Sequence, residues 1–181
     1  MKYEDIIKNE EINTYIKKAD ESLSALGFTE HSFAHVVRVA KTAEYILKTL
    51  DYDSHSIETV KIAAYLHDIG NLVNRVDHSQ SGAVLAFRLL DHMDIPPEDI
   101  ATIVTAIGNH DEGTGVPVNP ICAALILADK SDVRRSRVRN TDVSSFDIHD
   151  RVNYSVENAD LKISNDKKAI TLTIKIDTVY S

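Results

Sequence analysis

The sequence predicts a mainly α-helical domain followed by a small β-hairpin. Up to about residue 135, apolar residues recur at three- and four-residue intervals, as they do on one face of a helix. After about residue 150 they alternate with polar residues, which is the period of a half-buried strand. The chain has 181 residues, 43% of them apolar, and is long enough to bury one core without disulfides. We therefore predict one helical domain over residues 1–140 and a hairpin extension over residues 150–181.

Six helices follow from this periodicity and from the residues that begin and end helices. Gly27 and Gly70 stand where the first and third helices should stop, because glycine readily adopts the left-handed conformation of a helix C-terminus. Pro97 and Pro120 stand in the first turns of the last two helices, where proline is tolerated. The predicted helices cover residues 10–26, 31–50, 57–69, 80–93, 97–109 and 120–133.

The C-terminal residues predict two antiparallel strands joined by a polar turn. Leu161 and Ile163 alternate with polar residues before the turn at 164–167. After the turn, every second residue is apolar: Ile170, Leu172, Ile174 and Ile176. Because an isolated hairpin is only marginally stable in water, we expect its apolar face to pack on the helical domain or on a partner chain.

The composition argues against several classes of protein. The chain has 28 acidic and 20 basic residues, a net charge of −8, which disfavours bulk nucleic-acid binding. Its one cysteine, Cys122, excludes an internal disulfide and suits a reducing compartment. The polar N-terminus does not resemble a signal peptide, and no apolar run is long enough to span a membrane. We expect a cytoplasmic protein without a membrane partner.

Six titratable residues end or interrupt the apolar faces of five predicted helices. A single inward histidine is commonly a core residue whose hydrogen bonds are satisfied. A buried, unpaired carboxylate is harder to accommodate, because it loses its hydration. If all six face one interior, a divalent cation would accept the imidazole nitrogens and neutralise the carboxylates. Nitrogen and oxygen ligands without thiolate favour iron, manganese, nickel, cobalt or zinc. The six residues are His35, His67, Asp68, His78, His110 and Asp129.

Three motifs within residues 31–135 together resemble the HD superfamily of metal-dependent phosphohydrolases: His35-x-x-Arg38-Val39-Ala40, His67-Asp68-Ile69-Gly70 and the distant Asp129. The resemblance implies a helical HD domain. It also implies that one metal is held by His35, His67, Asp68 and Asp129. His78 and His110 match the two further histidines of members that hold a second metal. Asn71 follows Gly70 where many cyclic-dinucleotide members carry lysine, which weighs against a cyclic dinucleotide as the substrate.

The resemblance implies hydrolysis of a phosphoester or phosphoanhydride in a small substrate, for which a nucleotide is our first expectation. Two metals bridged by Asp68 would bind a phosphoryl oxygen and generate hydroxide near neutral pH. Arg38 and Lys130 are candidates to neutralise substrate charge at the catalytic centre. For both, an ordinary exposed surface cation is an equally good interpretation.

The only basic cluster of the sequence follows the last predicted helix. Arg134, Arg135 and Arg137, with Arg139 beyond them, could clamp a polyphosphate, because guanidinium groups match phosphate oxygens. The alternative is a solvated helix end whose cations complement the helix dipole.

The remaining histidines carry less information. His31 stands at a helix entrance, where it could contact the substrate beside the metal ligands. His55, His92 and His149 lack a coherent set of partners and are interpreted as surface or capping residues.

Two other functions remain open on the same residues. A regulatory module could keep the metal pocket without turnover, with the hairpin and the arginine run facing its partner. A di-iron oxygenase could use the same scaffold and ligand types. A small phosphorylated substrate is the expected partner, and a homodimer is compatible with the hairpin.

Overall fold

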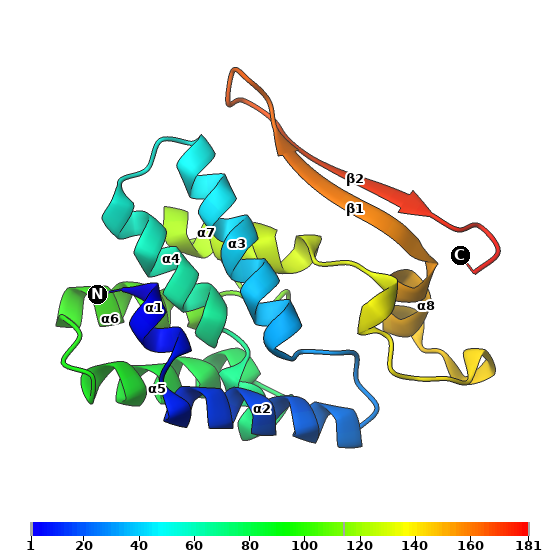
Figure 1. The fold of residues 1–181 in the computed structure, drawn as a ribbon, viewed down its shortest axis with the longest axis horizontal. Coiled ribbons are helices and arrows are strands. Elements are labelled where there is room, and N and C mark those ends of the chain that lie inside the picture. Colours follow the sequence, from blue (N-terminus) through cyan, green and yellow to red (C-terminus); the bar gives the residue numbers. More distant parts are fainter. Residues whose placement is uncertain (1, 114, 181) are drawn as a thin grey trace.

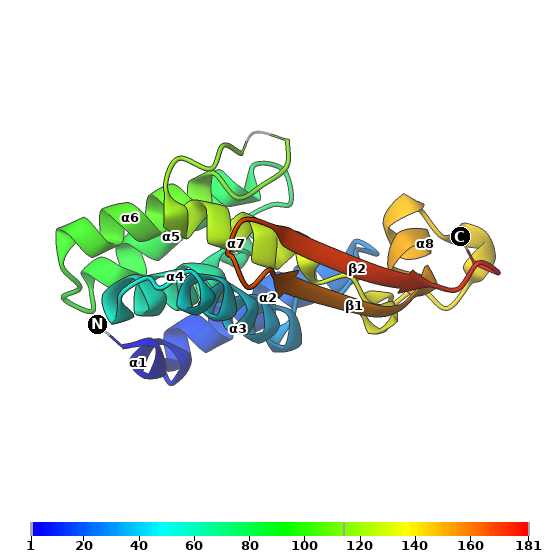
Figure 2. The same ribbon diagram turned by 90° about the horizontal axis from the view of Figure 1, so that it is seen from above.

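The computed structural model describes residues 2–113 and 115–180, which form one helical body and a two-stranded sheet (Figure 1). The hairpin runs over α7 and leads back to α8 (Figures 1 and 2). In chain order the elements are α1 (Tyr3–Ile7), α2 (Glu10–Ala25), α3 (Phe33–Thr49), α4 (Ser54–Leu66), the 3-10 turn η1 (Ile69–Leu72), α5 (His78–Asp91), α6 (Pro97–Gly108), α7 (Pro120–Ser131), η2 (Arg135–Arg137), η3 (Val143–Ser145), α8 (Ile148–Ser155), β1 (Val156–Ile163) and β2 (Ile170–Ile176).

The predicted fold class is confirmed, and each of the six predicted helices has a counterpart among the described residues. The largest differences lie at the helix ends. α4 begins at Ser54 because Asp53 caps it, accepting a hydrogen bond from the Ser56 amide at 2.9 Å. Its α-helical part ends at Leu66, so Gly70 falls within η1 and not at the end of α4.

Two helices, α1 and α8, lie outside the predicted set. α1 has five residues, too few to show a helical period. α8 has eight residues, and Asp147 caps its N-terminus by accepting a hydrogen bond from the Asp150 amide at 2.8 Å. It interrupts the segment that connects the helical body to the hairpin.

α4 lies at the centre of the core. Every residue from 59 to 66 is buried, and α4 contacts α1, α3, α6 and α7. Its Ile62 and Leu66 pack with large aliphatic side chains of the surrounding helices, among them Ile46, Ile103, Ile107 and Leu125. Within residues 2–113 and 115–180, no helix combines the length and apolarity needed to cross a bilayer.

The C-terminal hairpin is present as predicted, with antiparallel pairing of Leu161 with Leu172 and of Ile163 with Ile170. β1 is longer than the sequence indicated, because it begins at Val156 directly after α8. Leu161 and Ile163 pack against the helical core, and the Ile163 amide donates to the Tyr45 hydroxyl at 3.3 Å. The aliphatic side chains of β2 are 37 to 48% exposed, whereas Leu161 and Ile163 of β1 pack on the helical core.

η1 and α5 touch backbone to backbone at Gly70. A Cβ atom added to Gly70 would lie 1.9 Å from the His78 carbonyl oxygen and 2.4 Å from the Gly82 nitrogen. Neither backbone atom can move aside without shifting the helix. This contact therefore sets the distance between Asp68, which precedes η1, and His78, which begins α5.

Substituting Gly70→Ala should lower the free energy of unfolding by about 2–3 kcal/mol, the usual cost of forcing an atom into a closed contact. The matched control is Gly108→Ala, whose added Cβ has no neighbour nearer than 3.7 Å. Urea denaturation of the two variants would measure the difference. Equal stability of Gly70→Ala and the parent would contradict the predicted close contact.

Candidate metal centre

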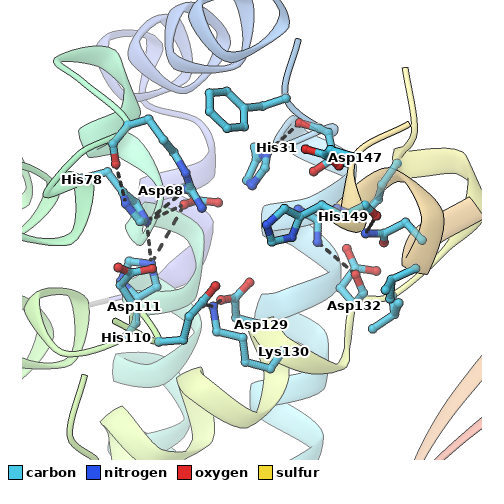
Figure 3. A pocket seen from close by; sticks show the side chains of 18 residues that line it. His31, Asp68, His78, His110, Asp111, Asp129, Lys130, Asp132, Asp147 and His149 are labelled. Carbon is cyan, nitrogen blue, oxygen red and sulfur yellow. Dashed lines mark hydrogen bonds and ion pairs between the residues drawn. The ribbon is translucent and has the colours of Figure 1, made fainter. Parts of the chain in front are cut away.

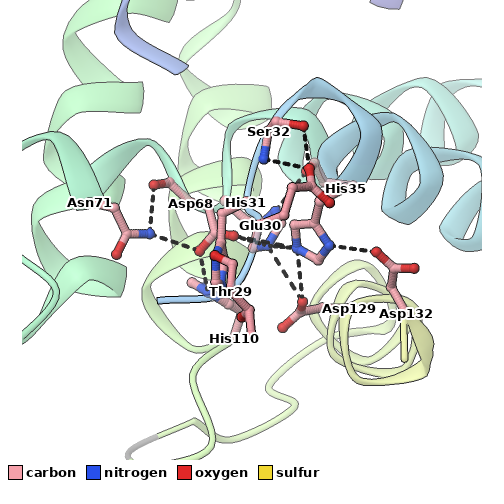
Figure 4. Close-up of polar contacts among 12 residues, drawn as sticks. Thr29, Glu30, His31, Ser32, His35, Asp68, Asn71, His110, Asp129 and Asp132 are labelled. Carbon is pink, nitrogen blue, oxygen red and sulfur yellow. Dashed lines mark hydrogen bonds and ion pairs between the residues drawn. The ribbon is translucent and has the colours of Figure 1, made fainter. Parts of the chain in front are cut away.

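The six side chains that the sequence predicts as ligands converge around Asp68, as Figure 3 shows for His78, His110 and Asp129 and Figure 4 for His35. They come from α3, from the junction of α4 and η1, from the start of α5, from the end of α6 and from α7: His35, His67 with Asp68, His78, His110 and Asp129. All are buried except Asp129, which is partly exposed. Helices distant in sequence thus place their polar residues together.

The first group joins His35, His67 and Asp129. The Nε2 atoms of the two imidazoles lie 3.3 Å apart. Asp129 Oδ1 lies 3.3 Å from Nε2 of His35 and 3.6 Å from Nε2 of His67. Asp68 Oδ2 completes this group at 3.4 and 3.1 Å from the same two nitrogens. Two nitrogens and two carboxylate oxygens therefore face a common point.

The second group joins His78 and His110. Their Nε2 atoms are 3.2 Å apart. Asp68 Oδ1 lies 3.5 Å from Nε2 of His78 and 4.0 Å from Nε2 of His110. Since Oδ2 of the same carboxylate belongs to the first group, Asp68 stands between the two pairs of imidazoles with one oxygen toward each.

Each of these imidazoles uses its Nδ1 atom to hold the ring in place. Nδ1 of His67, His78 and His110 bonds to the carbonyl oxygen three residues earlier, at 2.8, 3.1 and 2.6 Å. Nδ1 of His35 bonds to Asp132 Oδ2 at 2.8 Å (Figure 4). Such bonds orient a ring and leave Nε2 free to coordinate a metal.

The donor set fits a divalent cation. Asp68 Oδ2 is a buried atom that accepts no hydrogen bond from the described residues, a costly state unless positive charge lies beside it. Nε2 of His78 and Nε2 of His110 face each other while both Nδ1 atoms donate to carbonyls, so two lone pairs meet. A cation between these atoms would satisfy all of them. Imidazole and carboxylate donors suit first-row divalent metals.

Two of the imidazoles hold protons tightly when no cation is bound. Burial alone would lower the pKa of His35, but the carboxylates around it, Asp129 first, outweigh burial and raise it to about 9. Burial likewise opposes protonation of His67, yet the negative charge of Asp68 and the bond to Asp129 raise its pKa to about 10. By contrast, burial lowers the pKa of His110 to about 4. The centre therefore collects positive charge beside the two carboxylates.

Asp132 and Asn71 support the ligands, a role that the sequence did not predict for either residue. Asp132 is buried and orients His35. Asn71 Nδ2 donates to the backbone oxygen of Asp68 at 2.9 Å and to its Oδ1 at 3.0 Å. The only signal for Asp132 was its position three residues after Asp129, at the end of the same helix.

The two predicted catalytic cations differ in position. Lys130 lines the cavity above the centre, where its Nζ lies 2.9 Å from Asp129 Oδ2 and pairs with Glu112. Burial would lower its pKa, but Asp129 and Glu112 raise it to about 12, so the amine stays charged. Arg38 lies outside this cavity with a side chain that is 60% exposed, and its Nε is 3.4 Å from Asp132 Oδ1.

The arginine run does not form a clamp over the centre. Arg134 pairs with Glu30 and Asp132, and Arg135 donates to the Tyr154 carbonyl at 2.5 Å. Neither lines the cavity. Arg137 does line it, but its guanidinium is bound to the carbonyl oxygens of Glu30 and Asp132, both at 3.0 Å. The alternative, a solvated helix end, is not seen either. The guanidinium groups of Arg134, Arg135 and Arg137 instead bind carboxylate and carbonyl oxygens of other segments of the chain.

A cavity of about 290 Å³ opens over the centre (Figure 3). Four of the predicted ligands line it, Asp68, His78, His110 and Asp129, together with Lys130. It is also lined by His31, Asp147 and His149, which point toward it in Figure 3. His149 is exposed, in line with its interpretation as a surface or capping residue, and α8 in addition places it at the cavity rim. No sequence motif predicts the position of His149 at the cavity, because α8 itself lay outside the predicted helices.

The comparisons with known proteins agree with this arrangement. The family model described as HD domain matches residues 32–150, about two thirds of the chain. The chain belongs to the HD domain family. HD domains bind divalent metals, and two sets of side chains at this centre could hold one: His35 with His67 and Asp129, and His67 with Asp68 and His110.

Two relatives of this HD-domain chain were found. An uncharacterized protein from Methanocaldococcus jannaschii is 27% identical over 199 residues, covering 96% of this chain and 75% of the relative. A crystal structure of a predicted HD superfamily hydrolase from an uncultured Thermotogales bacterium is 28% identical, with a TM-score of 0.54, and the match covers 68% of this chain and 67% of that one.

Metal uptake should release protons in an amount that depends on pH. At pH 8 the metal-free centre holds protons on His35 and His67, because pH 8 lies below their pKa values of about 9 and about 10. A metal that takes Nε2 of both must displace them, so affinity should rise with pH and up to about two protons should leave per centre. Calorimetry in two buffers of different ionisation enthalpy would count them. Uptake with no proton release would contradict this.

Replacing Asp132 with asparagine should weaken metal binding by about 10- to 100-fold, the usual effect of disturbing the group that orients a histidine ligand. The bond from His35 Nδ1 would lose its charged acceptor. Asp142→Asn, at an exposed turn, serves as the control. Competitive titration against a metal indicator would measure both, and equal affinities would show that Asp132 does not orient the ligand.

Proposed function

We propose that this HD-domain chain is a metal-dependent phosphohydrolase acting on a small phosphorylated substrate, with a nucleotide as the favoured class. The observation that carries the proposal is the carboxylate of Asp68, placed between two pairs of imidazole nitrogens beneath an open cavity. Divalent metals bound at such a centre supply Lewis acidity toward phosphoryl oxygens and lower the pKa of coordinated water.

The residues of the chain have separate tasks in this proposal. Asp68 and Asp129 hold negative charge at the base of the cavity. Burial acts to raise the pKa of both carboxyl groups, but the nearby imidazoles outweigh it and hold these pKa values well below the usual range. Lys130 stays protonated beside Asp129 and offsets charge at the cavity wall. Among the described residues, no serine or cysteine stands at the centre as a nucleophile, and Cys122 is buried in α7.

The shape of the cavity favours a small organic phosphate. Its volume of about 290 Å³ is at the lower end of the range for ligand pockets. Polar ligands form its base, while Phe28, Val133 and Val152 give it apolar wall. A phosphate toward the base and a less polar group, such as a nucleoside, toward these side chains would match that division.

The test combines element analysis with a substrate panel. We expect purified protein to contain a divalent transition metal and to release phosphate from at least one member of a panel of nucleoside mono- and triphosphates and dinucleoside polyphosphates. His67→Ala should lose both metal and activity, by at least about 100-fold, because a ligand itself is removed. His92→Ala, an exposed histidine outside the cavity, should change neither.

The alternatives give different results in the same experiment. Stoichiometric metal with no hydrolysis across the panel would favour a regulatory binding module. Iron-dependent oxygen consumption with an organic substrate would favour an oxygenase. Either outcome would contradict phosphohydrolysis.

A further inference from the structure

Three cationic side chains line the described part of the cavity: Arg75, Lys130 and Arg137. Lys130 is engaged by two carboxylates and Arg137 by two carbonyl oxygens. Arg75 differs, because no described carboxylate forms an ion pair with its guanidinium. Its Nη1 contacts only the Asn71 side-chain oxygen at 3.5 Å and His78 Nε2 at 3.4 Å. Both distances are at the long end for hydrogen bonds, so these contacts are weak.

Arg75 contacts the His78 ring through its backbone as well as through its guanidinium. The Arg75 carbonyl oxygen accepts the bond from His78 Nδ1 at 3.1 Å, and the guanidinium lies 5.8 Å from the centre of the Phe28 ring. The same residue therefore orients one nitrogen of the His78 ring through its backbone and places a positive charge beside the other. That position is the His78 and His110 side of the centre.

This arrangement assigns Arg75 a role that rests on the proposed function. We propose that Arg75 forms a phosphate-binding subsite, donating to a non-bridging oxygen of the substrate phosphate on the His78 side of the centre. A cation on His78 Nε2 would take the lone pair that Arg75 now contacts, so the guanidinium must donate elsewhere. A phosphate oxygen at the cavity base accepts from such a planar fork in the geometry that guanidinium favours.

The charge of the cavity makes this one arginine important. Acidic side chains that line it include Asp111, Glu112 and Asp147, and each repels a phosphate. Lys130 is already paired with Glu112, whereas the guanidinium of Arg75 forms no ion pair with a described carboxylate. Arg75 can therefore bind a phosphate beside His78 without first breaking an ion pair.

The experiment measures binding of inorganic phosphate to Mn²⁺-loaded protein by calorimetry, with metal content determined for each variant. Arg75→Gln should bind phosphate about 10- to 100-fold more weakly, the range for losing one charge-assisted hydrogen bond, while keeping its metal. Arg75→Lys should recover part of the loss, because it keeps the charge without the fork. Arg88→Gln, an exposed arginine of α5 paired with Glu11, should match the parent.

Kinetics on the hydrolysed substrate supply a second readout. Arg75→Gln should raise KM more than it lowers kcat. Phosphate affinity equal to that of the parent would overturn the subsite, as would a parent that binds no phosphate. Loss of metal in Arg75→Gln would show that the side chain supports His78 instead, which also overturns it. His67-dependent hydrolysis with an unaffected Arg75→Gln would leave the proposed function standing alone, and phosphate binding that needs Arg75 without any hydrolysis would leave the subsite standing alone.

Discussion

Burial of the Asp68 carboxylate is the constraint on which the rest of the site depends. A buried carboxylate is costly unless cations or hydrogen bonds replace its hydration. Here Asn71 supplies one bond, and two pairs of imidazoles surround the remaining oxygen positions. Because those imidazoles come from helices that are far apart in sequence, the carboxylate can be accommodated only when the whole bundle is assembled. Stability of the fold and readiness for a metal are therefore linked through one side chain.

The helix ends solve the problem of orienting the ligands. The last carbonyl groups of a helix lack partners within the helix. His67 follows α4 and His110 lies just beyond α6, and each bonds to a carbonyl oxygen three residues before it. One interaction satisfies a carbonyl oxygen and directs Nε2 inward. Gly70 adds the close contact of η1 with α5 that brings His78 to the same point.

The part of the chain that follows α7 is attached to the helical body by arginines. Arg134 and Arg137 connect the segment after α7 to Glu30, and Arg139 pairs with Asp20 in α2. Arg135 lies against the rings of Tyr154 and Tyr180, 4.9 and 5.6 Å from their centres. These contacts set α8 beside the metal centre, so that His149 reaches the cavity rim. What looked in the sequence like a basic patch for a ligand is mainly a set of internal connections.

The sequence by itself determined the helical class, the hairpin and the six inward titratable residues. Helices and strands with one buried face repeat apolar residues at a fixed interval, and this interval can be read directly from the sequence. Asp132 and Asn71 left little trace, since one polar residue near a helix end has many ordinary explanations. Whether Arg75 or Arg134 faces the cavity was decided only by the tertiary structure. An arginine side chain is long and flexible, so its partners depend on which distant carboxylates and carbonyls the fold brings within reach. α8 was decided in the same way, because eight residues show too little periodicity to be recognised before their packing is known.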